Sequence, residues 1–181
     1  MLYGWNKFRG WEILEFFLEG NGKIHVNGLA KELKISKGTA QEYLTNYEKQ
    51  GLLEKEKIAN LVNYKLIDTP LTIELRKTYF ISKIIPHIKY FLSENKVIST
   101  LAMYGSHAKG SYDSKSDIDL LILSQDKRIN LDSLKKIEEK LGKEIKTQVF
   151  NLKEWRNLLD KKDNFAIAIV KNNILLFGEP L

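Results

Sequence analysis

The chain has 181 residues, of which 43% are hydrophobic, and a formal net charge of +6. This length suits one or two domains, and the apolar fraction is enough for a core in each. The chain has no cysteine, which excludes disulfides and cysteine-ligated zinc, and no apolar run reaches the roughly 18 residues of a membrane span. The first residues, MLYGW, lack the pattern of a secretory signal, so we expect a cytoplasmic protein that does not associate with membranes.

The N-terminal third begins with a helical pattern followed by a short extended one. Residues Gly10 to Leu18 place their large apolar side chains at helical spacing, which predicts a helix. Ile24 to Val26 is a short apolar segment and predicts a strand. Asn27 is expected to cap the helix that comes next, because its side chain can accept a hydrogen bond from the first turn.

A second helix and a hairpin follow in the same third of the chain. Ser36 is expected to cap a helix from Lys37 to Gln50, and Gly51 is expected to end it. Two segments with alternating side chains, at 52–57 and at 61–66, then predict the two strands of a hairpin. Residues 58–60 are expected to form the turn between them.

This order of elements resembles the winged helix-turn-helix domains of prokaryotic transcription regulators. The segments LAKEL at 29–33, ISKGTA at 35–40 and GLL at 51–53 carry the resemblance. It implies that the second helix of the turn enters the DNA major groove, with its N-terminal residues toward the bases. The residues expected to face double-stranded DNA are Ser36, Lys37, Thr39 and Gln41.

The same domain has an alternative use in protein contacts or dimerisation. Glu42 puts a carboxylate on the face that would meet DNA, and the charges of residues 1–68 nearly balance. A single winged helix binds DNA weakly, so a function on DNA would require a homodimer. Thr39 and Gln41 suit base edges, whereas Lys37 suits a phosphate.

A largely apolar helix is expected to join this domain to the rest of the chain. Thr69 would cap it, Pro70 would start it, and Pro86 should kink or interrupt its course from Leu71 to Leu92. An apolar helix between two domains either packs against its neighbour or forms a dimer seam, which would supply a two-fold axis.

The centre of the chain places two carboxylates beside a glycine turn. An apolar run from Val97 to Tyr104 predicts a strand that ends in Gly105, and a second strand follows from Ile118 to Leu123. Side chains alternate along a strand, so Asp117 and Asp119 share a face, with Cα atoms about 6.5 Å apart. That spacing suits one hard cation between them or two metals beside them, and a turn with free backbone N–H groups suits a phosphate.

This arrangement resembles the signature of the DNA polymerase beta-like nucleotidyltransferases, in particular the minimal ones. The matching residues are Gly105, Ser106, Ala108, Gly110, Ser116, Asp117, Ile118, Asp119 and Leu120. The resemblance implies transfer of a nucleoside monophosphate from an NTP, with Asp117 and Asp119 as catalytic ligands of one or two Mg²⁺ ions. It also implies that the nucleotide is bound by Gly105, Ser106, Lys109 and Ser116.

Two positions depart from the pattern of that family. The family places a third acid on a strand after the intervening helix, and here the best-aligned position in the strand 144–150 holds Gln148. Glutamine cannot take a proton from an attacking hydroxyl, so the identity of the catalytic base is open. Lys109 stands where many minimal transferases have arginine, which keeps the charge but loses the planar fork.

The remaining segments predict further helices and a last strand. The expected helices are 130–141, 152–159 and 165–170, and the expected strand is 173–177. His107 lies in the glycine turn and would either contact a phosphate or stay solvated there. The fold class is therefore α+β, in which a winged helix (1–68) and a linker helix (69–96) precede a nucleotidyltransferase domain (97–181) with a mixed sheet and flanking helices.

Two functions from different classes follow from these expectations. The first is an enzyme that uses Mg²⁺ to move a nucleotidyl group from an NTP to an unidentified acceptor. A resemblance to toxin–antitoxin transferases suggests a hydroxyl of a co-encoded protein as that acceptor. The second is a DNA-binding regulator whose degenerate transferase domain binds NTP as a ligand without turnover. Gln148 favours the second function, and the intact pair of Asp117 and Asp119 favours the first.

Overall fold

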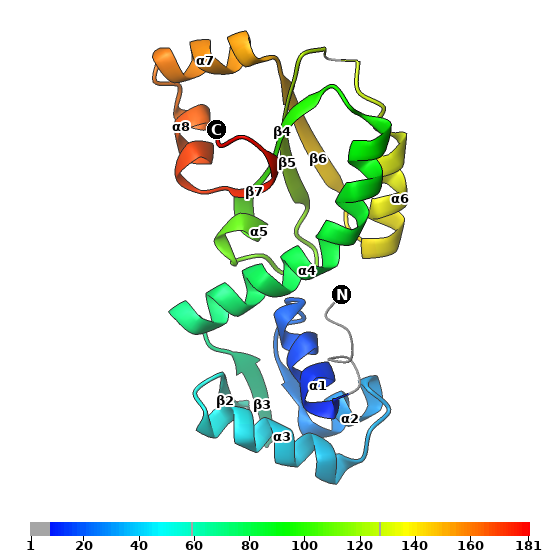
Figure 1. Cartoon of the computed structure of the whole chain (residues 1–181). Helices are drawn as coiled ribbons and strands as arrows, with labels where there is room; N and C mark the ends of the chain where they lie inside the picture. The colour runs from blue at the N-terminus through cyan, green and yellow to red at the C-terminus, as the bar shows by residue number, and fades with distance from the viewer. Residues whose placement is uncertain (1–7, 59, 127) are drawn as a thin grey trace. The chain divides into compact units, whose positions relative to one another are not determined.

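The computed structural model describes residues 8–58, 60–126 and 128–181, which form two compact units (Figure 1). The first unit ends at Tyr79 and the second runs from Phe80 to Leu181. The N-terminal MLYGW segment and Ala59 of the expected hairpin turn lie outside the described residues. The α+β class with a mixed sheet and flanking helices is confirmed, whereas the division into 1–68, 69–96 and 97–181 stays a prediction.

Ahead of the long helix that continues into the second unit, the described part of the first unit forms short helices and a small antiparallel sheet. Its strands follow the order β1-β3-β2, so the hairpin β2–β3 is extended on one side by the short β1. No helix among the described residues of the chain is long and apolar enough to cross a membrane. The elements are α1 (Arg9–Leu18), β1 (Ile24–His25), α2 (Val26–Glu32), α3 (Lys37–Lys49), β2 (Leu53–Ile58) and β3 (Leu61–Leu66).

The helix starts in this unit are set by side-chain caps. Ser36 caps α3 as predicted, since its hydroxyl accepts a hydrogen bond of 3.0 Å from the backbone N–H of Thr39. The predicted cap at Asn27 is wrong. The cap of α2 is His25, whose Nδ1 accepts from the N–H of Gly28 at 3.1 Å. The helix starts at Val26, so Asn27 already lies in its first turn.

The long helix α4 (Pro70–Glu94) contributes to the cores of both units in turn. Thr69 caps it as predicted, by accepting from the N–H of Thr72 at 3.3 Å. The helix continues through Pro86 without interruption. In the first unit Tyr79 is buried against α1, and its hydroxyl donates to Glu19 at 2.7 Å and to Glu15 at 2.9 Å. Burial, followed by the hydrogen bond to Glu19, raises the pKa of Tyr79.

The second unit is built around one four-stranded sheet. The strand order is β6-β5-β4-β7, in which β5 and β6 run parallel while the other pairs run antiparallel. Its elements are β4 (Ile98–Tyr104), α5 (Gly105–Lys109), β5 (Ile118–Ser124), α6 (Asp132–Leu141), β6 (Ile145–Phe150), α7 (Leu152–Asp160), α8 (Asn164–Lys171) and β7 (Ile174–Gly178).

Helices cover both faces of this sheet, and β5 alternates between them. Ile118, Leu120 and Ile122 pack on the face covered by α6 and the C-terminal half of α4. Leu121 and Leu123 pack on the other face, which α7 and α8 cover (Figure 1). The apolar residues of α4 that join the first of these cores are Phe80, Ile84, Ile88 and Phe91.

Candidate functional site

The two predicted acids lie at the start of the central strand β5. Asp119 is the second residue of β5 and pairs with Tyr104, the last residue of the antiparallel β4. Asp117 directly precedes the strand, and the buried Ile118 between them belongs to the opposite face. Asp117 and Asp119 are both partly exposed. The period of two along a strand therefore brings the carboxylates to one accessible edge.

Gly105 lies directly against the carboxylate of Asp119. It follows β4, has a φ of +72°, and begins the short helix α5. A Cβ atom built on Gly105 would overlap the Oδ2 atom of Asp119. Only glycine meets both conditions, because a side chain is disfavoured at this φ and has no room here. The structure thus brings together the glycine turn and one acid of the predicted site.

The other residues expected to bind nucleotide occupy different settings. Ser106 lies on α5 and is partly buried, and its carbonyl accepts a 3.0 Å hydrogen bond from the N–H of Ser111. Lys109 ends α5 and is exposed to solvent. The hydroxyl of Ser116 is engaged in the loop before β5, where it contacts Asp113 by two hydrogen bonds of 2.9 Å.

Lys143 holds this loop in place, a role that the sequence pattern does not indicate. Its Nζ atom donates to the carbonyls of Asp113 and Ser114 at 3.0 Å and of Ser116 at 3.3 Å. The residue lies just before β6, so it ties the approach to Asp117 to the neighbouring strand. A lysine ahead of a strand gives no local signal of such a contact, because its partners are more than twenty residues away in sequence.

The residue of β6 that lies beside the acid pair is Lys146, and not Gln148, which the sequence favoured as the residue in place of the third acid. In the parallel register of β5 and β6, Asp119 pairs with Lys146, whereas Gln148 pairs with Leu121. The Nζ atom of Lys146 lies 2.6 Å from Oδ2 of Asp117 and forms an ion pair with it. Gln148 is exposed on the same face of β6 as Lys146, but it lies two residues further along the strand, opposite Leu121.

The electrostatics of the site follow from burial and from this lysine. Burial raises the pKa of Asp119, Asp117 adds to the rise, and Lys146 opposes it. The hydrogen bond to Asp117 raises the pKa of Lys146. Burial, together with the charge of Asp119, raises the pKa of Tyr104. The acid pair therefore meets a fixed positive charge supplied by the chain itself.

His107 does not take either of the places expected for it. Its side chain is fully buried, and its ring stacks on Tyr112 with centroids 4.4 Å apart and planes at 9°. The ring of Phe80 lies 4.1 Å away between centroids. The histidine is thus part of the core beneath α5 and is neither solvated nor available to a phosphate.

Aromatic side chains line the sheet face that carries the acids. Tyr104 contacts Phe165 edge to face, with centroids 5.8 Å apart, and Phe165 lies 6.5 Å from Phe150. Phe165 remains 40% exposed and contacts Tyr104, the strand partner of Asp119, so an apolar surface lies next to this acid.

The donor set of the site fits a divalent cation in part. Asp117 and Asp119 offer the carboxylate oxygens that Mg²⁺ prefers. Within the ranges that the structure describes, no group of three or more His, Cys, Asp or Glu is placed to hold a metal. The residue opposite Asp119 on β6 is Lys146, whose ammonium group is no metal ligand and instead pairs with Asp117. The residues present therefore suit one cation.

The residues expected to face DNA lie at the start of α3. The hydroxyls of Ser36 and Thr39 are 2.8 Å apart and bonded to each other within the cap. Gln41 is exposed, and its amide donates to Thr45 at 2.9 Å and to Tyr64 at 3.3 Å. Lys37 is exposed in the first turn of α3.

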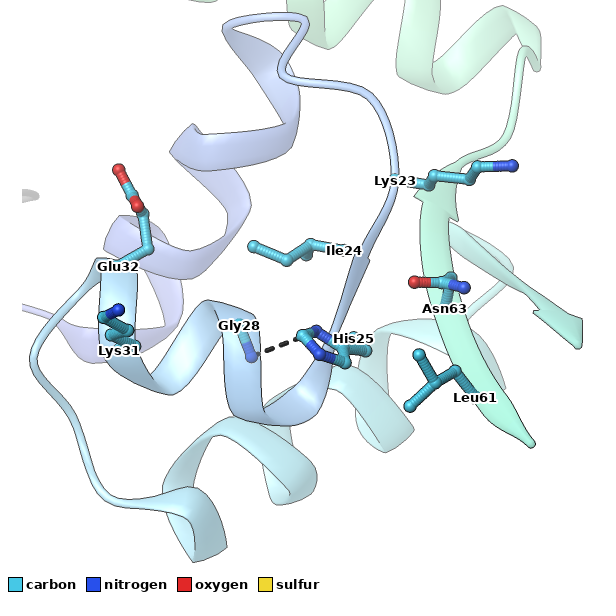
Figure 2. A pocket seen from close by; sticks show the side chains of 8 residues that line it. All are labelled: Lys23, Ile24, His25, Gly28, Lys31, Glu32, Leu61 and Asn63. Atoms are coloured by element: carbon cyan, nitrogen blue, oxygen red, sulfur yellow. Dashed lines mark hydrogen bonds between the residues drawn. The ribbon is translucent and has the colours of Figure 1, made fainter. Parts of the chain in front are cut away.

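A separate hollow on the first unit lies between β1, α2 and the hairpin strand β3. Figure 2 shows His25 in this hollow, with its ring accepting the hydrogen bond that caps α2. Lys23 at its rim forms an ion pair of 3.2 Å with Glu56. The lining combines apolar, basic and acidic side chains: Lys23, Ile24, His25, Gly28, Lys31, Glu32, Leu61 and Asn63. It contains none of the predicted site residues.

Comparison with known proteins identifies a family for the second half of the chain. The family described as "Polymerase beta, Nucleotidyltransferase" matches residues 86–180, which is more than half of the chain. This range includes Gly105, Asp117, Asp119 and Lys146. No curated protein matches the chain.

Solved structures show weaker likenesses to parts of the fold. A toxin–antitoxin complex with AMP-PNP is 19% identical, with 55% of this chain and 73% of the other covered and a TM-score of 0.38. A mutant of the toxin–antitoxin pair MntA–HpeT is 18% identical over the same shares, with a TM-score of 0.38. Reduced HlyU from Vibrio cholerae is 20% identical, with 44% and 79% covered and a TM-score of 0.34. Identities and TM-scores this low carry no information about substrate or partner.

Proposed function

We propose that this chain, which belongs to the polymerase beta nucleotidyltransferase family, moves a nucleoside monophosphate from an NTP to an acceptor hydroxyl in a Mg²⁺-dependent reaction. The observation that carries the proposal is the packing of the Asp119 carboxylate against Gly105, inside the range that the family matches. This contact places an acid beside the turn at which a triphosphate would lie.

The reaction is a substitution at the α-phosphorus of the NTP. An oxygen of the acceptor forms a bond to the α-phosphorus while the bond to the bridging oxygen of the β-phosphate breaks, and pyrophosphate leaves. The hydroxyl proton passes to a base or to solvent. A bound Mg²⁺ ion would neutralise charge on the phosphates.

The side chains of the site have distinct parts in this proposal. Asp117 and Asp119 would hold the cation, and Gly105 with Ser106 would accommodate the phosphates in close contact with the backbone. Lys109 is exposed at the end of α5 and would attract the triphosphate by its charge. Ser116 would act on the loop conformation, because its hydroxyl is bonded to Asp113.

Label transfer tests the proposed reaction directly. The chain is incubated with each of the four NTPs labelled at the α-phosphate, with Mg²⁺, alone and with a protein encoded beside it. We expect label on one of the two proteins, and its loss in Asp119→Asn. Asp160→Asn makes the same change on the exposed side of α7 and should leave transfer unchanged. Absence of transfer from every NTP to either protein would remove the proposal.

A second candidate is a DNA-binding regulator whose transferase unit holds NTP without turnover. Lys146 supports it, because a protonated lysine beside the acid pair cannot accept a proton from a hydroxyl. The first unit also supports it. Its order of helix, strand, two helices and hairpin, with Lys37 and Gln41 exposed on α3, is the order of a winged helix. Such a regulator would act as a homodimer.

A mobility shift at low salt tests this second candidate. Lys37→Ala should weaken binding to all sequences and lower the salt slope by about one, as for a lost phosphate contact. Gln41→Ala should relax sequence preference by about 1–3 kcal/mol. Lys49→Ala, in the last turn of the same helix, is the matched control and should change neither property. If the wild type retains no DNA, the first unit acts in protein contacts instead.

A further inference from the structure

We propose that the ammonium group of Lys146 takes the place of one cation in the nucleotide site, so that the chain binds a nucleoside triphosphate with a single divalent ion. This inference rests on the proposed nucleotide site and specifies how its charge is balanced. It also gives a role to the lysine that the strand register places opposite Asp119.

The position of Lys146 is set by strand pairing. It pairs with Asp119 across the parallel β5 and β6, and paired side chains on adjacent strands share a face. Its Nζ atom reaches back to Asp117, at 2.6 Å from Oδ2. The ammonium therefore contacts one acid of the pair and lies beside the other.

An ammonium at this position acts on a metal site in two ways. It donates hydrogen bonds and accepts none, so it occupies a lone pair of Asp117 that a metal would otherwise use. It also carries a charge that repels a second divalent ion a few ångströms away. Asp119, whose carboxylate lies against Gly105, remains as the main ligand for one ion beside the phosphate turn.

The surrounding groups strengthen this assignment. Lys143 fixes the loop before Asp117 through three backbone carbonyls, which holds the acid within reach of β6. Glu144 lies on the same face as Lys146, yet the side-chain hydrogen bond of the lysine goes to Asp117. The lysine thus supplies a permanent positive charge to a site in which both carboxylates and the triphosphate are negative.

The number of bound ions tests the inference. The protein is saturated with an α,β-methylene nucleoside triphosphate, in which a carbon bridge prevents transfer, and with Mn²⁺. Mn²⁺ is then counted by equilibrium dialysis, and its spin coupling is measured by electron paramagnetic resonance. We expect one uncoupled Mn²⁺ per wild-type chain and a coupled pair in Lys146→Asp, which adds a third carboxylate beside the acid pair. A coupled pair in the wild type would overturn the inference.

Two control variants test whether the effect of Lys146→Asp depends on position 146 or only on the change of charge. Gln148→Asp adds an acid on the same strand and face, but opposite Leu121, and should keep a single uncoupled ion. Lys153→Asp makes the same charge change as Lys146→Asp on the exposed surface of α7 and should also keep a single ion. A coupled pair in either control would overturn the inference, because the effect would then not depend on position 146.

A second variant covers the case in which Lys146→Asp does not fold. Lys146→Met keeps an unbranched side chain without its charge. Wild type should retain weak affinity for the nucleotide in EDTA, and Lys146→Met should lower that affinity about tenfold or more, as for a lost hydrogen bond to a charged group. Equal affinity of the two in EDTA would overturn the inference. A wild type without nucleotide affinity in Mg²⁺ would instead overturn the proposed function itself.

Discussion

Gly105 meets two requirements that no other residue type meets together. Its φ of +72° lies in the left-handed region, and a Cβ atom would overlap the Asp119 carboxylate. Gly142, which ends α6, has a similar φ of +64° but open space where a Cβ would lie. A side chain at Gly142 would therefore cause backbone strain alone, whereas one at Gly105 would cause the same strain and also overlap Asp119.

Alanine at each glycine should have different consequences for the site. Gly105→Ala and Gly142→Ala should both lower the free energy of unfolding by about 1–2 kcal/mol through left-handed strain. Only Gly105→Ala should also displace Asp119 and abolish Mg²⁺-dependent binding of NTP. Urea unfolding measures the first effect and calorimetry the second. Wild-type nucleotide affinity in Gly105→Ala would show that the contact with Asp119 is not needed.

The sequence predicted the acids better than it predicted their neighbour on β6. Alternation along a single strand places Asp117 and Asp119 on one face, whatever the rest of the fold does. The parity of β6 gives the face of Lys146 and Gln148 equally well, but it does not say which of them lies opposite Asp119. That register depends on contacts between distant segments, such as the 2.8 Å hydrogen bond from the N–H of Ile118 to the carbonyl of Glu144.

Helices were predicted most closely where a local cap marks their ends. Asn151 and Glu154 form a reciprocal capping box at the start of α7, and Gly142 ends α6 in the left-handed conformation. These signals act within four residues, so the sequence contains them in full. The prediction of Asn27 as the cap of α2 failed because β1 passes directly into α2, so that the capping position falls on His25, and histidine is an unusual cap. The burial of His107 was missed because Phe80 and Tyr112 approach it only in the folded unit.

The helix α4 carries a histidine whose titration should be visible in stability. Burial lowers the pKa of His87 from its ordinary 6.5, and the charge of Lys140 adds to the effect. Below pH 6.5 the unfolded chain therefore binds a proton that the folded chain does not yet bind. The free energy of unfolding should then fall as the pH drops from 6.5 toward the lowered pKa of the folded state.

Urea unfolding on both sides of pH 6.5 measures this dependence. His87→Gln should remove the part of the fall that the histidine causes. Lys140→Ala keeps the histidine but removes the repulsion between the two positive charges. The free energy of unfolding of this variant should therefore fall less with decreasing pH than that of the wild type. An identical pH dependence in His87→Gln and the wild type would show that His87 does not contribute.

At the scale of the whole molecule, neighbouring residues of α4 belong to different cores. Tyr79 packs with Leu14 and Leu18 in the first unit, and Phe80 packs with Ile118 and other residues of the second. The sequence predicted the helix but not this division, because an unbroken apolar stripe gives no sign of which core each turn will join.

Substitutions at these two positions should therefore act on different units. Phe80→Ala should destabilise the second unit by about 3–5 kcal/mol, and Tyr79→Ala should destabilise the first by a similar amount. Native-state hydrogen exchange distinguishes the two, since amides of β4 and β5 should lose protection only in Phe80→Ala. Equal loss of protection in both units in either variant would show that the chain unfolds as a single cooperative body.

Lys146 on β6 can be replaced by an acid through a single mutation. Lysine and glutamate codons differ by a single base, so an acid at position 146 is one mutation away from this sequence. The contact of Gly105 with Asp119, the pairing of Asp119 with Tyr104 and the hydrogen bonds of Lys143 to the loop do not include that residue. With the charge balance proposed for Lys146, descendants of this chain can pass between a site for one divalent ion and a site for two without rebuilding the rest of it.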